Sequence, residues 1–145
     1  GTPYSEADVT AAVGGLCLSI EIPDSRYTDF TAVGANQLIA DTACACWLVL
    51  SPPIAVAWRD IDLRTHEIAG VHNGAEVSRG PGRAALGGPL TALTWMANEA
   101  ARYCGGLKAG QFVTTGTCLK PFDMAPGDRI AADYGVLGRI TAEIT

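Results

Sequence analysis

One segment of the chain, residues 89–103, carries signals for both ends of a helix. It begins with Pro89, whose fixed backbone angle suits the first turn, and Gly105 and Gly106 follow its end. Apolar residues recur within it at helical spacing, so one face is expected to be buried. Elsewhere short apolar runs alternate with turn residues, and the chain contains 17 glycines. This pattern predicts one main helix among strands and turns, an α+β fold.

Short strands are expected on both sides of this helix. Residues 16–22 are an apolar run that Pro23 ends, which indicates a buried strand. Asn73 and Gly74 stand between residues 65–71 and 75–78 and predict a hairpin with a type I′ turn. Three further strands are predicted at residues 111–115, 129–134 and 139–144. Residues 38–50 are nearly all apolar, and periodicity leaves open a buried strand pair or a buried helix leading into a strand.

Local signals and large side chains give two more expectations. Ser5 to Asp8 have the form of a capping box, which predicts a short helix to about residue 13. Trp47, Trp58 and Trp95 are interpreted as packing residues, with Trp95 on the buried side of the main helix.

Composition excludes several classes of protein. The 145 residues are expected to form one domain, and the net charge of −5 argues against nucleic-acid binding through phosphate contacts. The chain has no basic run and no apolar stretch of membrane-spanning length, so no membrane partner is expected.

The cysteines indicate a reducing environment. Five cysteines without a regular framework are typical of free thiols, which predicts a cytoplasmic protein. Cys44 and Cys46 have no second Cys or His pair near them in the sequence. We therefore expect neither a disulfide nor a zinc site there.

Charged residues stand at the end of the first apolar run. A carboxylate that faces an apolar layer is costly unless it is paired, hydrogen-bonded or bound to a metal, so the position of Glu21 leaves hydrogen bonding and metal ligation open. Asp24 and Arg26 are interpreted as a carboxylate–guanidinium pair that fixes the loop carrying Glu21.

A series of short motifs continues from this point through nearly the whole chain. They are Glu21-Ile22-Pro23-Asp24-Ser25-Arg26, Ile39-Ala40-Asp41, Asn73-Gly74, Leu86-Gly87-Gly88-Pro89-Leu90, Trp95-Met96-Ala97-Asn98, Gly106-Leu107-Lys108-Ala109-Gly110, Thr115-Gly116-Thr117, Pro126-Gly127-Asp128 and Ala132-Asp133-Tyr134-Gly135-Val136-Leu137-Gly138. In this order the motifs resemble the hydratase/decarboxylase branch of the fumarylacetoacetate hydrolase superfamily. The resemblance implies a mixed β-sheet roll of the family's C-terminal type with one main helix.

The resemblance also implies a divalent metal, Mg²⁺ or Mn²⁺. In this family three carboxylates hold the ion, two from a Glu-x-Glu pair and the third at the position of Glu21. The chain contains no Glu-x-Glu, and the family's N-terminal half has no counterpart in it. Residues 1–145 are therefore expected to be the C-terminal portion of a longer catalytic domain. One carboxylate does not complete the octahedral oxygen shell of Mg²⁺.

Six residues become candidates for the site. By resemblance, Glu21 is the metal ligand, Arg26, Thr42 and Cys44 bind substrate, and Asp41 and Thr117 are catalytic. Thr42 and Cys44 replace the Asn and Ser common in the family, which predicts altered substrate choice or reduced activity because a thiol is a weak donor. Two simpler interpretations stay open: Asp41 as a helix-capping residue, and Thr117 as part of a strand-to-loop transition.

The implied activity is the metal-dependent hydration of a 2-hydroxy-2,4-dienoate, of the 2-keto-4-pentenoate type, to a 4-hydroxy-2-oxo acid in aromatic ring-cleavage catabolism. The partner is then a small 2-oxo or 2-hydroxy dienoic acid, and the resemblance implies a homo-oligomer. The alternatives are a 4-oxalocrotonate-type 2-oxo-acid decarboxylase, and a non-catalytic partner subunit or fragment without the full metal site.

Overall fold

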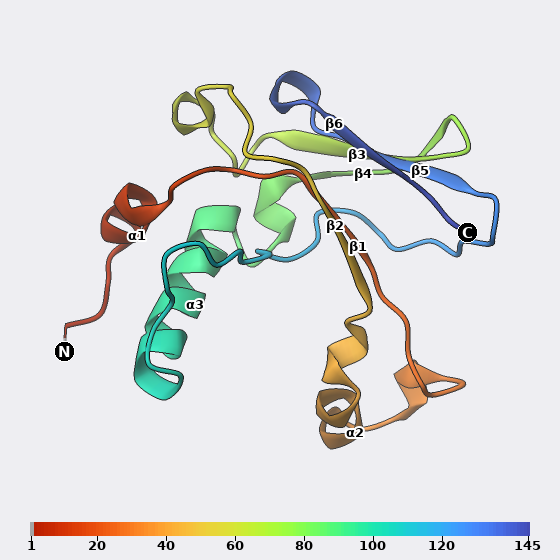
Figure 1. Cartoon of the computed structure of the whole chain (residues 1–145), viewed down its shortest axis with the longest axis horizontal. Coiled ribbons are helices and arrows are strands. Elements are labelled where there is room, and N and C mark those ends of the chain that lie inside the picture. The colour runs from red at the N-terminus through yellow and green to blue at the C-terminus, as the bar shows by residue number, and fades with distance from the viewer. Residues whose placement is uncertain (1) are drawn as a thin grey trace.

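The computed structural model describes residues 2–145 and shows a helix-flanked pair of sheets (Figure 1). One sheet has four strands in the order β4-β3-β5-β6, and the other is a two-stranded ribbon of β1 and β2. Every strand pair is antiparallel. The elements are α1 (Glu6–Ala12), β1 (Ser19–Ile22), α2 (Ala35–Ala40), β2 (Trp47–Leu50), β3 (Glu67–His72), β4 (Ala75–Pro81), α3 (Pro89–Tyr103), β5 (Arg129–Asp133) and β6 (Arg139–Glu143). The α+β class with one main helix is confirmed.

The helices begin and end where local signals place them. The Ser5 side chain accepts from the Asp8 backbone N–H at 3.2 Å, and the Asp8 carboxylate accepts from the Ser5 N–H at 2.9 Å, which closes the predicted capping box. Helix α3 has the predicted bounds. Gly105 and Gly106 leave it with φ of 72° and 81°, values that glycine adopts at little cost.

The hairpin of β3 and β4 is also confirmed. Asn73 and Gly74 have φ of 49° and 88°, the two positive values that a type I′ turn requires. Asn73 is fixed further by Asp128, whose carboxylate accepts from its side-chain amide at 2.8 Å. The turn of the hairpin is thus joined to the start of β5.

Residues 38–50 follow the second of the two open interpretations. Helix α2 is followed by a tight turn at Thr42–Cys44 and then by β2. The expected burial of the helix is wrong, because Ile39 is 72% exposed.

The expected strand at residues 111–115 and the expected burial of two tryptophans are also wrong. Residues 111–115 form no strand; they run irregularly beside α3 (Figure 1) and make one backbone–backbone hydrogen bond, from the Gln111 N–H. A strand needs a neighbouring strand, and none among residues 2–145 reaches this segment. Trp58 is buried as expected, whereas Trp47 and Trp95 are 71% and 60% exposed.

The main core lies where β1 meets the four-stranded sheet. Leu18, Trp58, Ala132, Leu137 and Ile140 form one buried cluster. This cluster holds the start of the ribbon against β5 and β6, while the far end of the ribbon extends away from it toward α2 (Figure 1). Over residues 2–145 no helix has the length and apolar character needed to cross a membrane.

Candidate functional site

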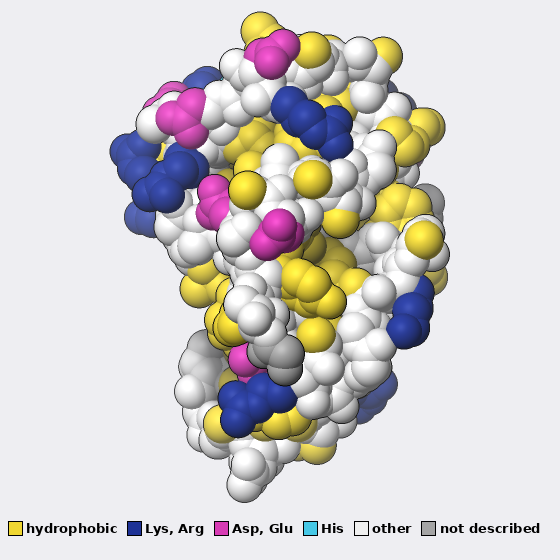
Figure 2. Space-filling model, turned by 90° about the vertical axis from the view of Figure 1, so that its left-hand side faces the viewer, with side chains coloured by type: hydrophobic (Ala, Val, Ile, Leu, Met, Phe, Trp, Pro, Cys, Tyr) yellow, Lys and Arg dark blue, Asp and Glu magenta, His cyan; other side chains and the backbone are white. Residues whose placement is uncertain are grey.

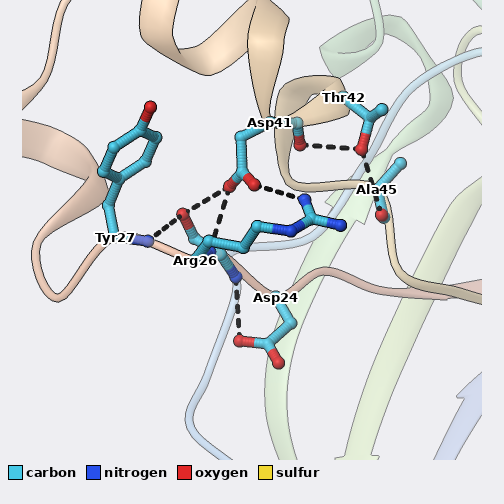
Figure 3. A network of polar contacts seen from close by, with 7 residues as sticks. Asp24, Arg26, Tyr27, Asp41, Thr42 and Ala45 are labelled. Atoms are coloured by element: carbon cyan, nitrogen blue, oxygen red, sulfur yellow. Dashed lines mark hydrogen bonds and ion pairs between the residues drawn. The ribbon is translucent and has the colours of Figure 1, made fainter.

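Four of the six candidate residues lie at the far end of the ribbon, around the buried carboxylate of Asp41. They are Arg26, Asp41, Thr42 and Cys44, and Figure 3 labels the first three. Asp41 is 3% exposed and is the one buried charged residue among residues 2–145. Its Oδ2 accepts from the Ser25 hydroxyl at 2.7 Å and from the Arg26 N–H at 3.1 Å, and its Oδ1 accepts from Arg26 Nη1. The loop that follows β1 is thereby fastened to the end of α2.

The partner of Arg26 is therefore Asp41, and the predicted pairing of Arg26 with Asp24 is wrong. Asp24 is exposed, and its carboxylate instead accepts from the Ser25 N–H at 2.8 Å. Asp41 is the stronger partner because a buried carboxylate is costly unless it is paired, whereas water already stabilises the exposed carboxylate of Asp24.

The contacts of Asp41 keep it ionised. Hydrogen bonds from the Ser25 hydroxyl, and then from Arg26, lower the pKa of the Asp41 carboxyl below its usual value. The same contact with Asp41 raises the pKa of Arg26. With both oxygens occupied by donors, Asp41 is poorly placed to take a proton from a substrate. Its backbone N–H also donates to Gln37 O and Leu38 O, so the capping interpretation holds alongside the ion pair.

The turn after Asp41 is unusual in its backbone. Thr42, Ala43 and Cys44 have φ of 55°, 53° and 62°, so three consecutive residues other than glycine adopt the left-handed conformation. This conformation is unfavourable for residues with a Cβ and is an outlier for a β-branched threonine. The Thr42 hydroxyl donates to the Asp41 carbonyl at 2.7 Å, and the Asp24 N–H donates to the Cys44 carbonyl at 3.0 Å.

Glu21 lies on β1, the strand that leads into this loop, but its side chain is exposed. The expectation that it ends a buried strand is wrong, because it pairs with Leu48 in a ribbon whose Leu48 is itself 45% exposed. Among residues 2–145 no group of three or more His, Cys, Asp or Glu side chains is placed to hold a metal ion. This chain alone does not fit a complete Mg²⁺ shell.

A large hollow lies at the end of the ribbon opposite the Asp41 cluster, between α1, α3, the start of β1 and residues 106–116. Its volume is about 920 Å³, and its lining is mainly apolar (Figure 2). His66, Cys118 and Tyr134 contribute polar groups to the lining. Burial raises the pKa of Cys118, and burial also raises the pKa of Tyr134, although the hydrogen bond to Ser19 opposes that rise.

Thr117 is not brought to the Asp41 cluster or into the lining of the hollow. Thr115 and Gly116 line the hollow, whereas the Thr117 hydroxyl bonds the backbone N–H and carbonyl of Leu119, both at 3.2 Å. The strand-to-loop interpretation is wrong as well, because no strand precedes Thr117 and the residue lies in a small turn of an irregular segment. A catalytic role for Thr117 stays a prediction.

Two residues important to the site were not singled out from the sequence. Ser25 supplies the hydroxyl that Asp41 accepts, and Tyr134 donates its hydroxyl to the Ser19 carbonyl at 2.8 Å, which joins β1 to the end of β5. Both lie inside motifs that mark the family resemblance, and that position was the available signal.

The C-terminal family of fumarylacetoacetate (FAA) hydrolase matches residues 1–145, which is the whole chain. The chain belongs to the fumarylacetoacetate hydrolase family. Among its relatives in the family, 4-oxalocrotonate decarboxylase of Pseudomonas putida is 35% identical over 93% of the chain and 50% of the relative. The 2-keto-4-pentenoate hydratase of Burkholderia vietnamiensis is 34% identical over 98% of the chain and 53% of the relative.

Solved structures of fumarylacetoacetate hydrolase family members agree with the fold. The 4-oxalocrotonate decarboxylase of Pseudomonas putida G7, complexed with magnesium and adipate, matches with a TM-score of 0.89 and 31% identity, covering the whole chain and 54% of that structure. The same enzyme complexed with calcium and acetate gives a TM-score of 0.86. The chain spans about half the length of the relatives it matches.

Proposed function

We propose that the protein containing this chain is a divalent-metal-dependent hydratase that converts a 2-hydroxy-2,4-dienoate to a 4-hydroxy-2-oxo acid. The observation that carries the proposal is the match, over 98% of the chain, to a 2-keto-4-pentenoate hydratase, together with the Asp41 cluster beside the strand of Glu21. A hydratase that acts on the TodF product in Pseudomonas putida F1 is similarly related, at 33% identity over 98% of the chain.

The residues of this chain have distinct parts in the proposal. Glu21 offers one carboxylate to the ion, and its exposure leaves it free for a partner outside residues 1–145. Arg26 is 80% exposed, so part of its guanidinium remains available to a substrate carboxylate although Nη1 is bound to Asp41. Thr42 and Cys44, in the turn that follows Asp41, are assigned to the same substrate, to which they would offer a hydroxyl and a thiol. A bound divalent ion would supply Lewis-acid polarisation of the 2-oxo group.

The proposal assigns the other metal ligands to an N-terminal half of the same protein. The solved relative is complexed with magnesium in one structure and with calcium in the other, and this chain covers 54% of it. We therefore assign the remaining metal ligands to the part of the protein that this chain does not cover. The apolar hollow and the exposed Trp47 of the ribbon are surfaces that such a half would cover. The exposed aromatic side chain of Trp95, on α3, similarly supports a homo-oligomer. A cytoplasmic location is part of the proposal.

Decarboxylation of a 4-oxalocrotonate-type 2-oxo acid is the second candidate. It is favoured by the 35% identity to a decarboxylase and by the TM-score of 0.89 to its solved relative. Both reactions pass through a stabilised enolate of a 2-oxo acid, so the same arrangement serves either. They differ in whether water is added at C4 or a carboxylate leaves as CO₂.

One experiment separates the two. The full-length protein is given 2-hydroxypenta-2,4-dienoate or 4-oxalocrotonate with Mg²⁺, and ultraviolet absorbance and released CO₂ are followed together. We expect loss of dienoate absorbance with formation of 4-hydroxy-2-oxopentanoate and no CO₂. Release of CO₂ from 4-oxalocrotonate without dienoate hydration would replace the proposal with the second candidate, and no turnover of either substrate would refute both.

A further inference from the structure

The left-handed turn at Thr42–Cys44 is held in place by bonds to a distant loop. The Asp41 carboxylate accepts three hydrogen bonds from Ser25 and Arg26, and the Asp24 N–H donates to the Cys44 carbonyl at 3.0 Å. Residues 24–26 thus hold both ends of the turn, and Figure 3 shows the contacts at the Asp41 end. A backbone in an unfavourable conformation persists only where its surroundings fix it, and such strain is concentrated at binding sites.

We propose that Asp41 is a positioning residue, which acts by holding the Thr42–Cys44 turn in its left-handed conformation and so sets the place of the Thr42 and Cys44 groups that face a 2-oxo acid. The inference rests on the proposed function for its ligand, and on the backbone and hydrogen bonds alone for the turn. It assigns Asp41 no proton transfer. It also explains why the buried carboxylate is bound by donors from one short loop only.

The chemistry of the Asp41 contacts makes Asp41→Asn a sharp perturbation. The Asp41 carboxylate is the acceptor in all three hydrogen bonds, and Oδ2 and Oδ1 each face an N–H of Arg26. Whichever way an asparagine amide is turned, its –NH₂ faces one of these donors. The variant therefore weakens the hold on the turn with almost no change in volume.

Ala43 offers a rescue that only a positioning role predicts. Ala43 lies at φ 53° and ψ 40°, where glycine is far less strained than alanine. In an Asp41→Asn background, Ala43→Gly therefore makes the left-handed turn easier to keep. Ala45 is the matched control: it is also exposed but lies at φ −66° and ψ 123°, so Ala45→Gly gives the turn no such help.

The test uses the full-length protein and two measurements. The first is hydrogen exchange of the Cys44 and Ala45 amides, which donate to Asp41 O and Thr42 O and close the turn. The second is the affinity for 2-oxopentanoate, a saturated analogue, with Mg²⁺ present. If only a fraction of the molecules keep the turn in its binding-competent conformation, the apparent affinity falls in proportion to that fraction. In Asp41→Asn we expect the two amides to exchange about tenfold faster or more, and the affinity for 2-oxopentanoate to fall by about tenfold or more.

The outcome of the rescue decides the inference. Ala43→Gly should recover part of both losses in the Asp41→Asn protein, and Ala45→Gly should recover neither. Equal effects of the two glycine substitutions, or unchanged exchange in Asp41→Asn, would overturn it. If Asp41→Asn does not fold, Ser25→Ala, which removes a single bond to Asp41, is used with the same pair. A wild-type protein that does not bind 2-oxopentanoate would refute the proposed function, while the exchange rescue would still decide the role of Asp41.

Discussion

Removing the hydroxyl of Tyr134 should measurably loosen the attachment of β1 to the four-stranded sheet. This hydroxyl donates to the Ser19 carbonyl at 2.8 Å, while the ring packs against the core cluster. Tyr134→Phe keeps the ring and leaves the carbonyl without this donor. A neutral hydrogen bond contributes about 1 kcal/mol net, and an unpaired buried acceptor costs about 1–3 kcal/mol. Because both groups are only partly buried, we expect a loss of about 1–1.5 kcal/mol in the free energy of unfolding.

The assay is urea unfolding of the full-length protein, followed by circular dichroism and checked by thermal melting. For a domain of this size, a loss of 1 kcal/mol lowers the melting temperature by about 2–4 °C. Tyr103→Phe is the matched control, because the Tyr103 side chain is 66% exposed, and it should leave the unfolding free energy unchanged. A loss below about 0.3 kcal/mol for Tyr134→Phe would refute the reasoning, since it is smaller than the net contribution of about 0.5–1.5 kcal/mol that a hydrogen bond makes to stability.

Two further predictions concern the four-stranded sheet. An alanine Cβ at Gly80 would stand 1.9 Å from the Cys118 carbonyl oxygen. Gly80→Ala should therefore lower the free energy of unfolding, measured in urea, by about 1–3 kcal/mol. The control Gly14→Ala, whose Cβ meets nothing within 4 Å, should change that free energy by less than about 0.5 kcal/mol. Hydrogen bonds, the largest from Asn73, lower the pKa of Asp128 from 3.8 to about 2. A carboxyl group with a lowered pKa stabilises the fold above the pKa of the unfolded chain and loses this effect as pH falls toward the folded value. The gap in melting temperature between wild type and Asp128→Asn should therefore narrow as the pH falls from about 4 to about 2, and a constant gap would contradict the assignment.

Elements bounded by local signals could be predicted from the sequence. The capping box at Ser5, the bounds of α3 and the type I′ turn at Asn73 depend on a few neighbouring residues, and each is where the sequence places it. The prediction of a strand at residues 111–115 was wrong because a strand depends on a partner strand. An apolar, β-branched pattern does not reveal whether that partner lies within the same 145 residues. The misjudged burial of Glu21 has the same cause: an apolar run indicates burial without showing what covers it.

The sequence predicted which of the candidate residues lie together better than it predicted their contacts. Arg26, Asp41, Thr42 and Cys44 do lie together, as the motifs indicated. The pairing of Arg26 with Asp41 was missed because sequence proximity favoured Asp24, whereas the burial of a carboxylate 15 residues away decided it. The left-handed turn was missed because it contains no glycine or asparagine to signal it; long-range hydrogen bonds impose it.

Titration of Mg²⁺ into the full-length protein by calorimetry tests the central claim, that this chain supplies one ligand, Glu21, to a metal site completed elsewhere in the protein. Wild-type protein should bind one Mg²⁺, and Glu21→Gln should weaken binding by more than about 10-fold, the loss that even a supporting residue can cause. Glu99→Gln, on α3, is the matched control and should bind as wild type does. Residues 1–145 alone should bind weakly, because one carboxylate does not fill an octahedral shell. Unchanged Mg²⁺ affinity in Glu21→Gln, or micromolar affinity in residues 1–145 alone, would contradict the account.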